Sequence, residues 1–178
     1  MKVFIITLAV IVLYTFTIIF TQDYRQAQRN SYRVKYVCEE LSASAATFYD
    51  REQYSEGYTV FDTGQGIRAI EDQLTNLLSV DDSGNPIPGS YWSDALHYRV
   101  YFYDDLLERK EYTDGSLTGT GSFSYPYSHN DEWTGYNTII TCPTVIVTIN
   151  AGIGKFRLNF LDSLPNMVRS ASHEWEDR

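Results

Sequence analysis

Three short segments of the sequence combine residue types that bind metal ions or take part in catalysis. His173-Glu174 matches the start of a zinc-protease helix, but the second histidine that such a helix places four positions later is absent. His129-Asn130-Asp131-Glu132 offers oxygen and nitrogen ligands, and its aromatic and Ser/Gly-rich flanks favour a polar loop tip. Residues 81–85 resemble a calcium loop, but Gly84 comes too early for the usual sixth-position glycine and two prolines follow, which favours an ordinary solvated turn. We therefore predict no metal site, and no motif calls for a cofactor.

Motifs for nucleophilic catalysis and for phosphate binding are also absent from the sequence. It contains no G-x-S-x-G elbow, no P-loop and no Cys–His catalytic signature. The glycines of residues 115–121 lie in a hairpin pattern, whereas a phosphate loop needs them between a strand and a helix. The net charge of −9 argues against nucleic acid as a partner, because phosphate binding needs an excess of Lys and Arg. We predict that the chain is not an enzyme and does not bind nucleic acid.

Two cysteines, Cys38 and Cys142, are the remaining candidates for covalent chemistry. Outside the cytoplasm they could form a disulfide that joins a helix to the sheet, which the chain-entropy model values at about 4–5 kcal/mol for a loop of this length. In the cytoplasm both would be buried thiols. The sequence leaves both alternatives open.

The element that positions everything else is an apolar segment at the N-terminus. Val3 to Phe20 are eighteen consecutive positions without a formal charge, and as a helix they span roughly 27 Å, close to the ~30 Å hydrocarbon core of a bilayer. A cleaved signal peptide is the alternative, but its apolar region is usually shorter and ends at a small-x-small site that is absent here. We predict a retained transmembrane anchor over residues 1–21 of a single-pass membrane protein.

The charges that follow the anchor bear on its orientation. Residues 22–36 carry four basic side chains against Asp23, whereas residues 37–178 carry nine basic and 22 acidic ones. The positive-inside rule would leave the C-terminal part in the cytoplasm, but long domains translocate despite flanking charge. The tyrosine-rich, strand-rich remainder is typical of an exported module. We therefore expect a cell-membrane protein whose C-terminal domain is extracytoplasmic, with the basic stretch near anionic headgroups on either side.

An amphipathic stripe continues from the anchor through residues 22–56, before the first glycine at Gly57. Its 3,4 spacing predicts one continuous rod of about 45 residues, roughly 70 Å long, in which the anchor runs into a stalk helix. The stripe could pack on the chain's own domain, or it could pack against other copies of the chain in an assembly. Both could also hold, with the lower half of the stripe in the assembly and the upper half against the domain. We name it the predicted seam, and its residues are Tyr24, Ala27, Ser31, Val34, Cys38, Leu41, Ala45 and Phe48.

Residues 57–178 predict an α+β head. A helix from Gly66 to Ser79, capped by Asp62 or Thr63, is followed by a loop over residues 81–89, after which the apolar period changes to two. Residues 164–175 are ambiguous between a helix and a last strand. The predicted strands are 96–103, a hairpin with arms at 108–112 and 116–125 around Thr113-Asp114-Gly115, 138–141, 145–149 and 156–160. The predicted fold class is thus α+β, with a transmembrane helix that continues into a long stalk helix, a second short helix and an antiparallel sheet.

Fifteen tyrosines and three tryptophans are a further unusual feature, and many of them fall in the predicted sheet. Tyrosine suits interfaces because it offers a large contact area and a hydroxyl group at low entropic cost. Aromatic residues also suit the pleated surface of any strand, so a purely structural role is an equally valid interpretation.

The layout of an N-terminal membrane helix, an alanine-containing stalk and a β-rich head resembles that of type IV pilin-like proteins. Residues 38–46, Phe61 with the helix at 67–78, and the strand at 143–149 are similar to TadE-like minor pilins of tight-adherence systems in Gram-positive bacteria. The resemblance does not extend to the N-terminus, because Met1-Lys2-Val3 lacks the glycine that precedes the pilin apolar segment, and no glutamate follows five residues into it.

The resemblance implies a structural subunit of a bacterial surface fibre or secretion system, either pilin-like or accessory. Its partners would be the membrane and other subunits, copies of itself or pilin-like proteins, that contact the stalk helix. The alternative hypothesis is a single-pass anchored binding module that recognises a ligand or a cell-wall component through its tyrosine-rich sheet.

Overall fold

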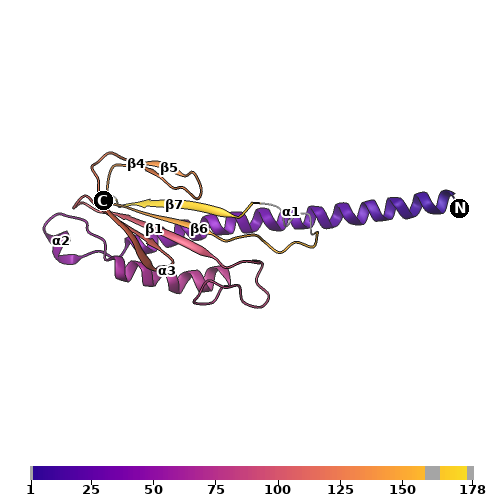
Figure 1. The fold of residues 1–178 in the computed structure, drawn as a ribbon, viewed down its shortest axis with the longest axis horizontal. Coiled ribbons are helices and arrows are strands. Elements are labelled where there is room, and N and C mark those ends of the chain that lie inside the picture. The colour runs from indigo at the N-terminus through magenta and orange to yellow at the C-terminus, as the bar shows by residue number, and fades with distance from the viewer. Residues whose placement is uncertain (1, 159–164, 176–178) are drawn as a thin grey trace.

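The computed structural model describes residues 2–158 and 165–175, and it confirms the predicted α+β fold (Figure 1). A long helix leads into a head in which an antiparallel sheet packs on helices. The elements are α1 (Lys2–Ala46), α2 (Arg51–Ser55), α3 (Thr63–Leu78), β1 (His97–Tyr103), β2 (Glu108–Thr113), β3 (Ser116–Ser122), β4 (Tyr127–Asn130), β5 (Asn137–Ile140), β6 (Thr144–Asn150) and β7 (Val168–Glu174).

Helix α1 is a single helix of 45 residues, so the predicted continuity of anchor and stalk is confirmed. It ends at Ala46 rather than at residue 56, so the expected end of the stalk helix is wrong. Phe48 and Tyr49 leave the helix because Tyr49 forms a β-bridge with Phe61. Asp50 then caps the separate helix α2 by accepting the backbone N–H of Glu52 at 2.8 Å.

Helix α3 matches the predicted second helix, with its start three residues earlier. The carboxylate of Asp62 accepts the backbone N–H of Gln65 at 3.0 Å and satisfies one of the unpaired donors of the first turn. Its apolar face, which includes Ile70, Leu74 and Leu78, is buried against α1 and the sheet.

Five strands form an antiparallel sheet in the order β3-β2-β1-β6-β7, and β4 and β5 form a separate two-stranded sheet. The hairpin between β2 and β3 turns at Asp114 and Gly115, as predicted. Both residues have positive φ angles, 47° and 74°, as a two-residue type I′ turn requires. Strand β6 lies between β1 and β7, and six of its seven residues are buried.

Strand β4 was not expected, because its sequence Tyr127–Asn130 is short and mostly polar. Residues 156–158 are not in a strand, which corrects the prediction there, and the remaining positions of that predicted strand, 159 and 160, lie outside the described residues. The ambiguous segment contains strand β7, and its first position, residue 164, also lies outside them.

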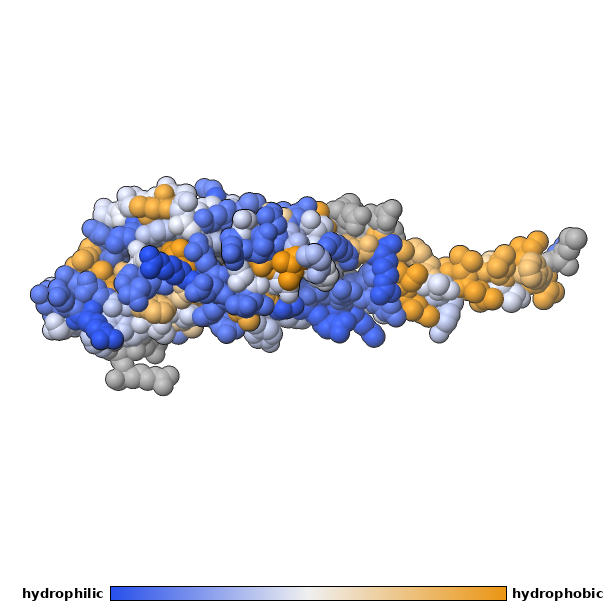
Figure 2. Space-filling model, turned by 90° about the horizontal axis from the view of Figure 1, so that it is seen from below, coloured by the Kyte–Doolittle hydropathy of each residue, from blue (hydrophilic) through white to orange (hydrophobic). Residues whose placement is uncertain are grey.

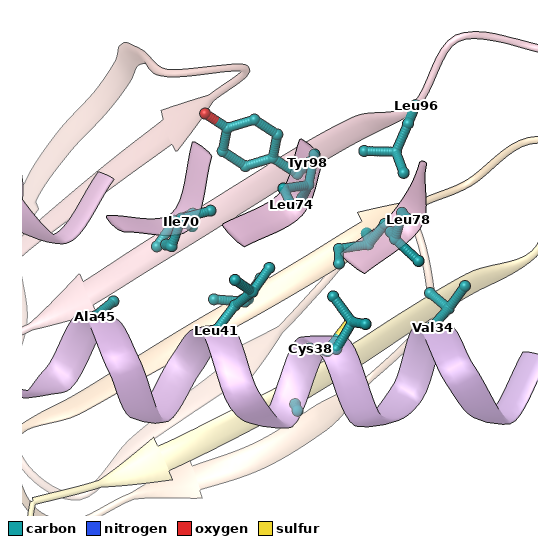
Figure 3. Close-up of a cluster of buried hydrophobic side chains, with 14 of the residues drawn as sticks. Val34, Cys38, Leu41, Ala45, Ile70, Leu74, Leu78, Leu96 and Tyr98 are labelled. Atoms are coloured by element: carbon teal, nitrogen blue, oxygen red, sulfur yellow. The ribbon is translucent and has the colours of Figure 1, made fainter. Parts of the chain in front are cut away.

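The two faces of the five-stranded sheet bury two separate clusters. Figure 3 shows the larger one, in which side chains of α1 and α3 meet those of β1. The smaller cluster lies on the other face, where Tyr101, Tyr103 and Ile146 pack with Ile140 of β5. Strand alternation separates Tyr98 and Val100 from Tyr101 and Tyr103, because successive side chains point to opposite faces of a sheet.

Candidate functional site

The N-terminal half of α1 projects from the head as an apolar rod (Figures 1 and 2). The helix is long and apolar enough to cross a membrane, and its most apolar stretch has no buried residue. The threonines within it add no unsatisfied hydroxyl donor, because Thr7, Thr15 and Thr17 each donate to the carbonyl four residues earlier. The segment could therefore span a bilayer, as its length and composition predict.

The upper half of the predicted seam belongs to the head's own core. Val34, Cys38, Leu41 and Ala45 are all fully buried, and they face Ile70, Leu74 and Leu78 of α3 (Figure 3). From Val34 to Ala45 the predicted seam therefore packs on the chain's own domain, which was one of the alternatives for this stripe. These four side chains are not available to a second subunit while the head is folded.

The lower half of the seam is partly covered by the segment that follows β6. The backbone N–H of Arg157 donates to Oδ2 of Asp23 at 2.9 Å, and the Arg157 guanidinium donates to Oε1 of Gln22 at 2.8 Å. Higher up, the guanidinium of Arg169 in β7 donates to the hydroxyl of Ser31. Tyr24 remains exposed, and Ala27, Ser31 and Phe48 are half-buried. The sequence pattern does not predict the burial of Asp23, whose side chain is only 2% exposed. A single acidic residue that follows an apolar segment is expected to be solvated.

The opposite face of α1 is open. Tyr32 and Tyr36 are 60% and 65% exposed, with Arg29 one turn below on the same side. Together with Val37 and with Leu77 of α3 they line a groove of about 430 Å³ whose surface is mainly apolar. The guanidinium of Arg33 closes one edge of this groove by donating to the carbonyl of Leu77. This outer face is the part of the stalk that another chain can reach.

The tyrosines of the sheet serve mainly as core residues. Tyr98, Tyr101 and Tyr103 are buried, and Tyr127 packs on Tyr103 with ring centroids 5.5 Å apart. Tyr125 likewise packs edge-on against Phe123. The structural interpretation of the tyrosine-rich sequence therefore holds for Tyr98, Tyr101 and Tyr103.

The segment His129 to Glu132 is not a solvated loop tip, since His129 and Asp131 are both buried. Nδ1 of His129 lies 2.8 Å from the Tyr103 hydroxyl, and Oδ2 of Asp131 accepts the backbone N–H of Thr134 at 2.8 Å. Burial lowers the pKa of His129, so the imidazole is neutral at pH 7. These contacts hold the β4–β5 sheet on the aromatic face, and within the described ranges no group of His, Cys, Asp and Glu side chains could hold a metal ion.

An acidic hollow of about 430 Å³ lies beside α3 and the turn at residues 81–84. Three of its five lining carboxylates, those of Glu71, Asp81 and Asp114, accept hydrogen bonds from the head. Glu71 accepts from the Tyr98 hydroxyl, and Asp114 accepts from the Tyr98 backbone N–H, both at 2.9 Å. Asp81 accepts the N–H groups of Asn85 and Ser83, and these bonds lower its pKa. The predicted solvated turn is therefore found, held by an Asp that bonds its own loop.

The two cysteines are not joined by a disulfide. Cys38 Sγ donates to the carbonyl of Arg169, which pairs with Ile149 near the end of β6, whereas Cys142 precedes the start of that strand. The strand from Thr144 to Ile149 alone rises about 17 Å at ~3.3 Å per residue. A disulfide needs Cα atoms less than about 7 Å apart, so the Cys38–Cys142 pair does not fit this fold.

Comparison with known proteins yields no match: no family model fits the chain, and neither a curated protein nor a solved structure is similar to it. Function must therefore be inferred from the chain's own residues.

Proposed function

We propose that this chain is a membrane-anchored, extracytoplasmic structural subunit, a pilin-like or accessory component of a bacterial surface fibre or secretion system. One observation carries the proposal. The apolar anchor and the helix in the head's core are the same uninterrupted helix, α1, from Lys2 to Ala46. No loop separates them, so the head cannot move independently of the anchor.

A rigid connection of this kind suits a building block better than a receptor. A receptor that searches for ligand gains from a flexible linker, whereas a subunit in an assembly must transmit its position from the membrane to the head. Three tyrosines of the sheet, Tyr98, Tyr101 and Tyr103, are buried and are not available to a ligand. These features support assembly as the function of the chain.

The proposed contact to other subunits is the outer face of α1. The face opposite the predicted seam carries the exposed rings of Tyr32 and Tyr36. Exposed aromatic rings are among the residue types that protein interfaces favour. Copies of the chain, or pilin-like partners, would pack here, while Val34 to Ala45 stay inside each head.

Site-specific photocrosslinking of the full chain in its native membrane tests the proposal. A benzophenone amino acid in place of Tyr32 or Tyr36 should give a ladder of adducts with copies of the chain or with one partner subunit. The matched control is the same replacement at Tyr58, which is exposed but lies beyond α2 on the head. An absence of protein adducts at Tyr32 and Tyr36, or an equal ladder at Tyr58, would contradict the proposal.

Protease added to intact cells tests the extracytoplasmic location separately. We expect cleavage within the head and survival of an anchor fragment. A head that is digested only after the membrane is opened would place it in the cytoplasm instead.

A further inference from the structure

The foot of the head lies beside the end of the apolar segment. Residues 151–158, which follow β6, run back along α1 toward its N-terminal half (Figure 1). This segment is held by backbone bonds from Lys155 N to Tyr91 O at 2.7 Å and from Ser93 N to Ile153 O at 3.0 Å. Arg157 then bonds Gln22 and Asp23, only two and three residues beyond Phe20. The charge of Arg157 is thereby fixed at the level where the apolar segment ends.

Among the described residues of α1 from 22 to 36 and of the segment 155–158, the exposed charged side chains at this level are basic. Asp23 is the only acidic residue among positions 22–36, and it is buried under the Arg157 backbone. Arg25, Arg29 and Arg157 are exposed. Other basic side chains nearby contact the protein instead: Arg33 bonds the carbonyl of Leu77, and Lys35 pairs with Glu39 at 3.6 Å. Arg25 and Arg29 are thus exposed at the foot of the head, and Arg157 is exposed there while its guanidinium also bonds Gln22.

These arginines also lie at the right height for a bilayer surface. Arg25 is five residues beyond Phe20, about 7.5 Å along the helix, and the headgroup layer on each side of a bilayer is about 5–8 Å thick. Tyr24 stacks on Phe20 with ring centroids 6.4 Å apart and is 56% exposed, as an amphipathic ring at a membrane interface is. Arg29 is one turn higher, and its long side chain can extend down toward the headgroups.

We propose that Arg25, Arg29 and Arg157 form a basic collar that binds anionic phospholipid headgroups and sets the height and orientation of the head on the bilayer. Charge complementarity favours this partner, because residues 37–178 carry 22 acidic against nine basic side chains and are repelled by an anionic surface. The collar holds the foot on the surface while this repulsion keeps the rest of the head away. The inference rests on the membrane anchoring in the proposed function.

Lipid selectivity of the full chain tests the collar. The chain is reconstituted in phosphatidylcholine vesicles with a trace of spin-labelled phosphatidylglycerol or spin-labelled phosphatidylcholine, and the share of motionally restricted lipid is measured. We expect phosphatidylglycerol to be preferred. Arg25→Gln and Arg157→Gln should each reduce the preference by up to about fivefold, and high salt should reduce it further. Arg157→Gln keeps the backbone bond to Asp23, so the foot stays folded.

Arg51→Gln is the matched control, since Arg51 is an equally exposed arginine on α2, at the far end of the head (Figure 1). It should leave the preference unchanged. A wild-type chain that floats with the vesicles but does not prefer phosphatidylglycerol would overturn the collar alone. An equal loss in Arg51→Gln would also overturn it. A chain that fails to float with the vesicles would overturn the proposed anchoring together with the collar.

Discussion

The two halves of helix α1 share one backbone but have opposite surroundings. From Val3 to Phe20 most side chains are large and exposed, whereas from Val34 to Ala46 the side chains on one face are mostly smaller and are buried. Small residues such as Cys38 and Ala45 let the helix lie close to α3 and the sheet, and large residues there would be overpacked. Apolar character alone therefore does not identify a core, because the apolar side chains of one half are exposed and those of the other are packed in the head.

The largest effect is expected when the same charged residue is placed in each half of α1. Leu41→Asp buries an unpaired carboxylate in the larger cluster, so we expect the head to unfold, with a loss of more than about 4 kcal/mol. Leu13→Asp should leave the thermal unfolding of the head unchanged but reduce the fraction of the chain in membranes. Circular dichroism in detergent and membrane fractionation measure the two effects, and a folded Leu41→Asp head would contradict the assignment of this stripe to the core.

The reactivity of Cys38 tests how completely the upper half is enclosed. Burial raises the pKa of the Cys38 thiol from its ordinary value of 9.0 to about 12. Only the thiolate is alkylated, so at pH 8 the reaction should be about 1,000-fold slower than that of an ordinary thiol. The rate should rise about tenfold per pH unit as long as the head stays folded. Mass spectrometry of iodoacetamide-treated Cys142→Ser chain measures it, and the fully unfolded chain is the control; equal rates in both would show that Cys38 is accessible.

Asp23→Asn tests the contact between Asp23 and Arg157 at the boundary between the two halves of α1. The asparagine removes the charge that accepts the Arg157 N–H, so we expect a loss of about 1 kcal/mol and roughly fivefold faster amide exchange at Arg157. Asp50→Asn, at the exposed N-cap of α2, should be neutral because Asn and Asp cap helices equally well. Unchanged exchange at Arg157 would mean that the foot is not held through Asp23.

The smallest effect is expected on the outer face. Tyr36→Ala should change the free energy of unfolding of the isolated chain by less than about 0.5 kcal/mol, because this side chain is exposed. Chemical denaturation in detergent measures it. A loss above 1 kcal/mol would assign Tyr36 to the fold of the monomer rather than to a contact surface.

Much of the fold could be predicted from local patterns. The apolar run at Val3 to Phe20, the cap at Asp62 and the Asp114-Gly115 turn each depend on neighbours within a few residues, and each is found where it was expected. The end of α1 was missed because Phe48 and Tyr49 leave the helix for a bridge to Phe61, twelve positions away from Tyr49. The burial of His129 was missed because its partner, Tyr103, comes from another sheet.

The amino-acid order determined that α1 is long, that its first half is uniformly apolar and that a narrower apolar stripe follows, because helical period and hydropathy are local properties. Tertiary structure alone decided what covers that stripe. The same 3,4 spacing would fit a sister helix or the chain's own α3, and the choice depends on the sheet and loops that fold back on α1 from far along the chain. Burial is a property of all the elements that meet at a surface, so the pattern of one helix shows which side is apolar but not which partner it contacts.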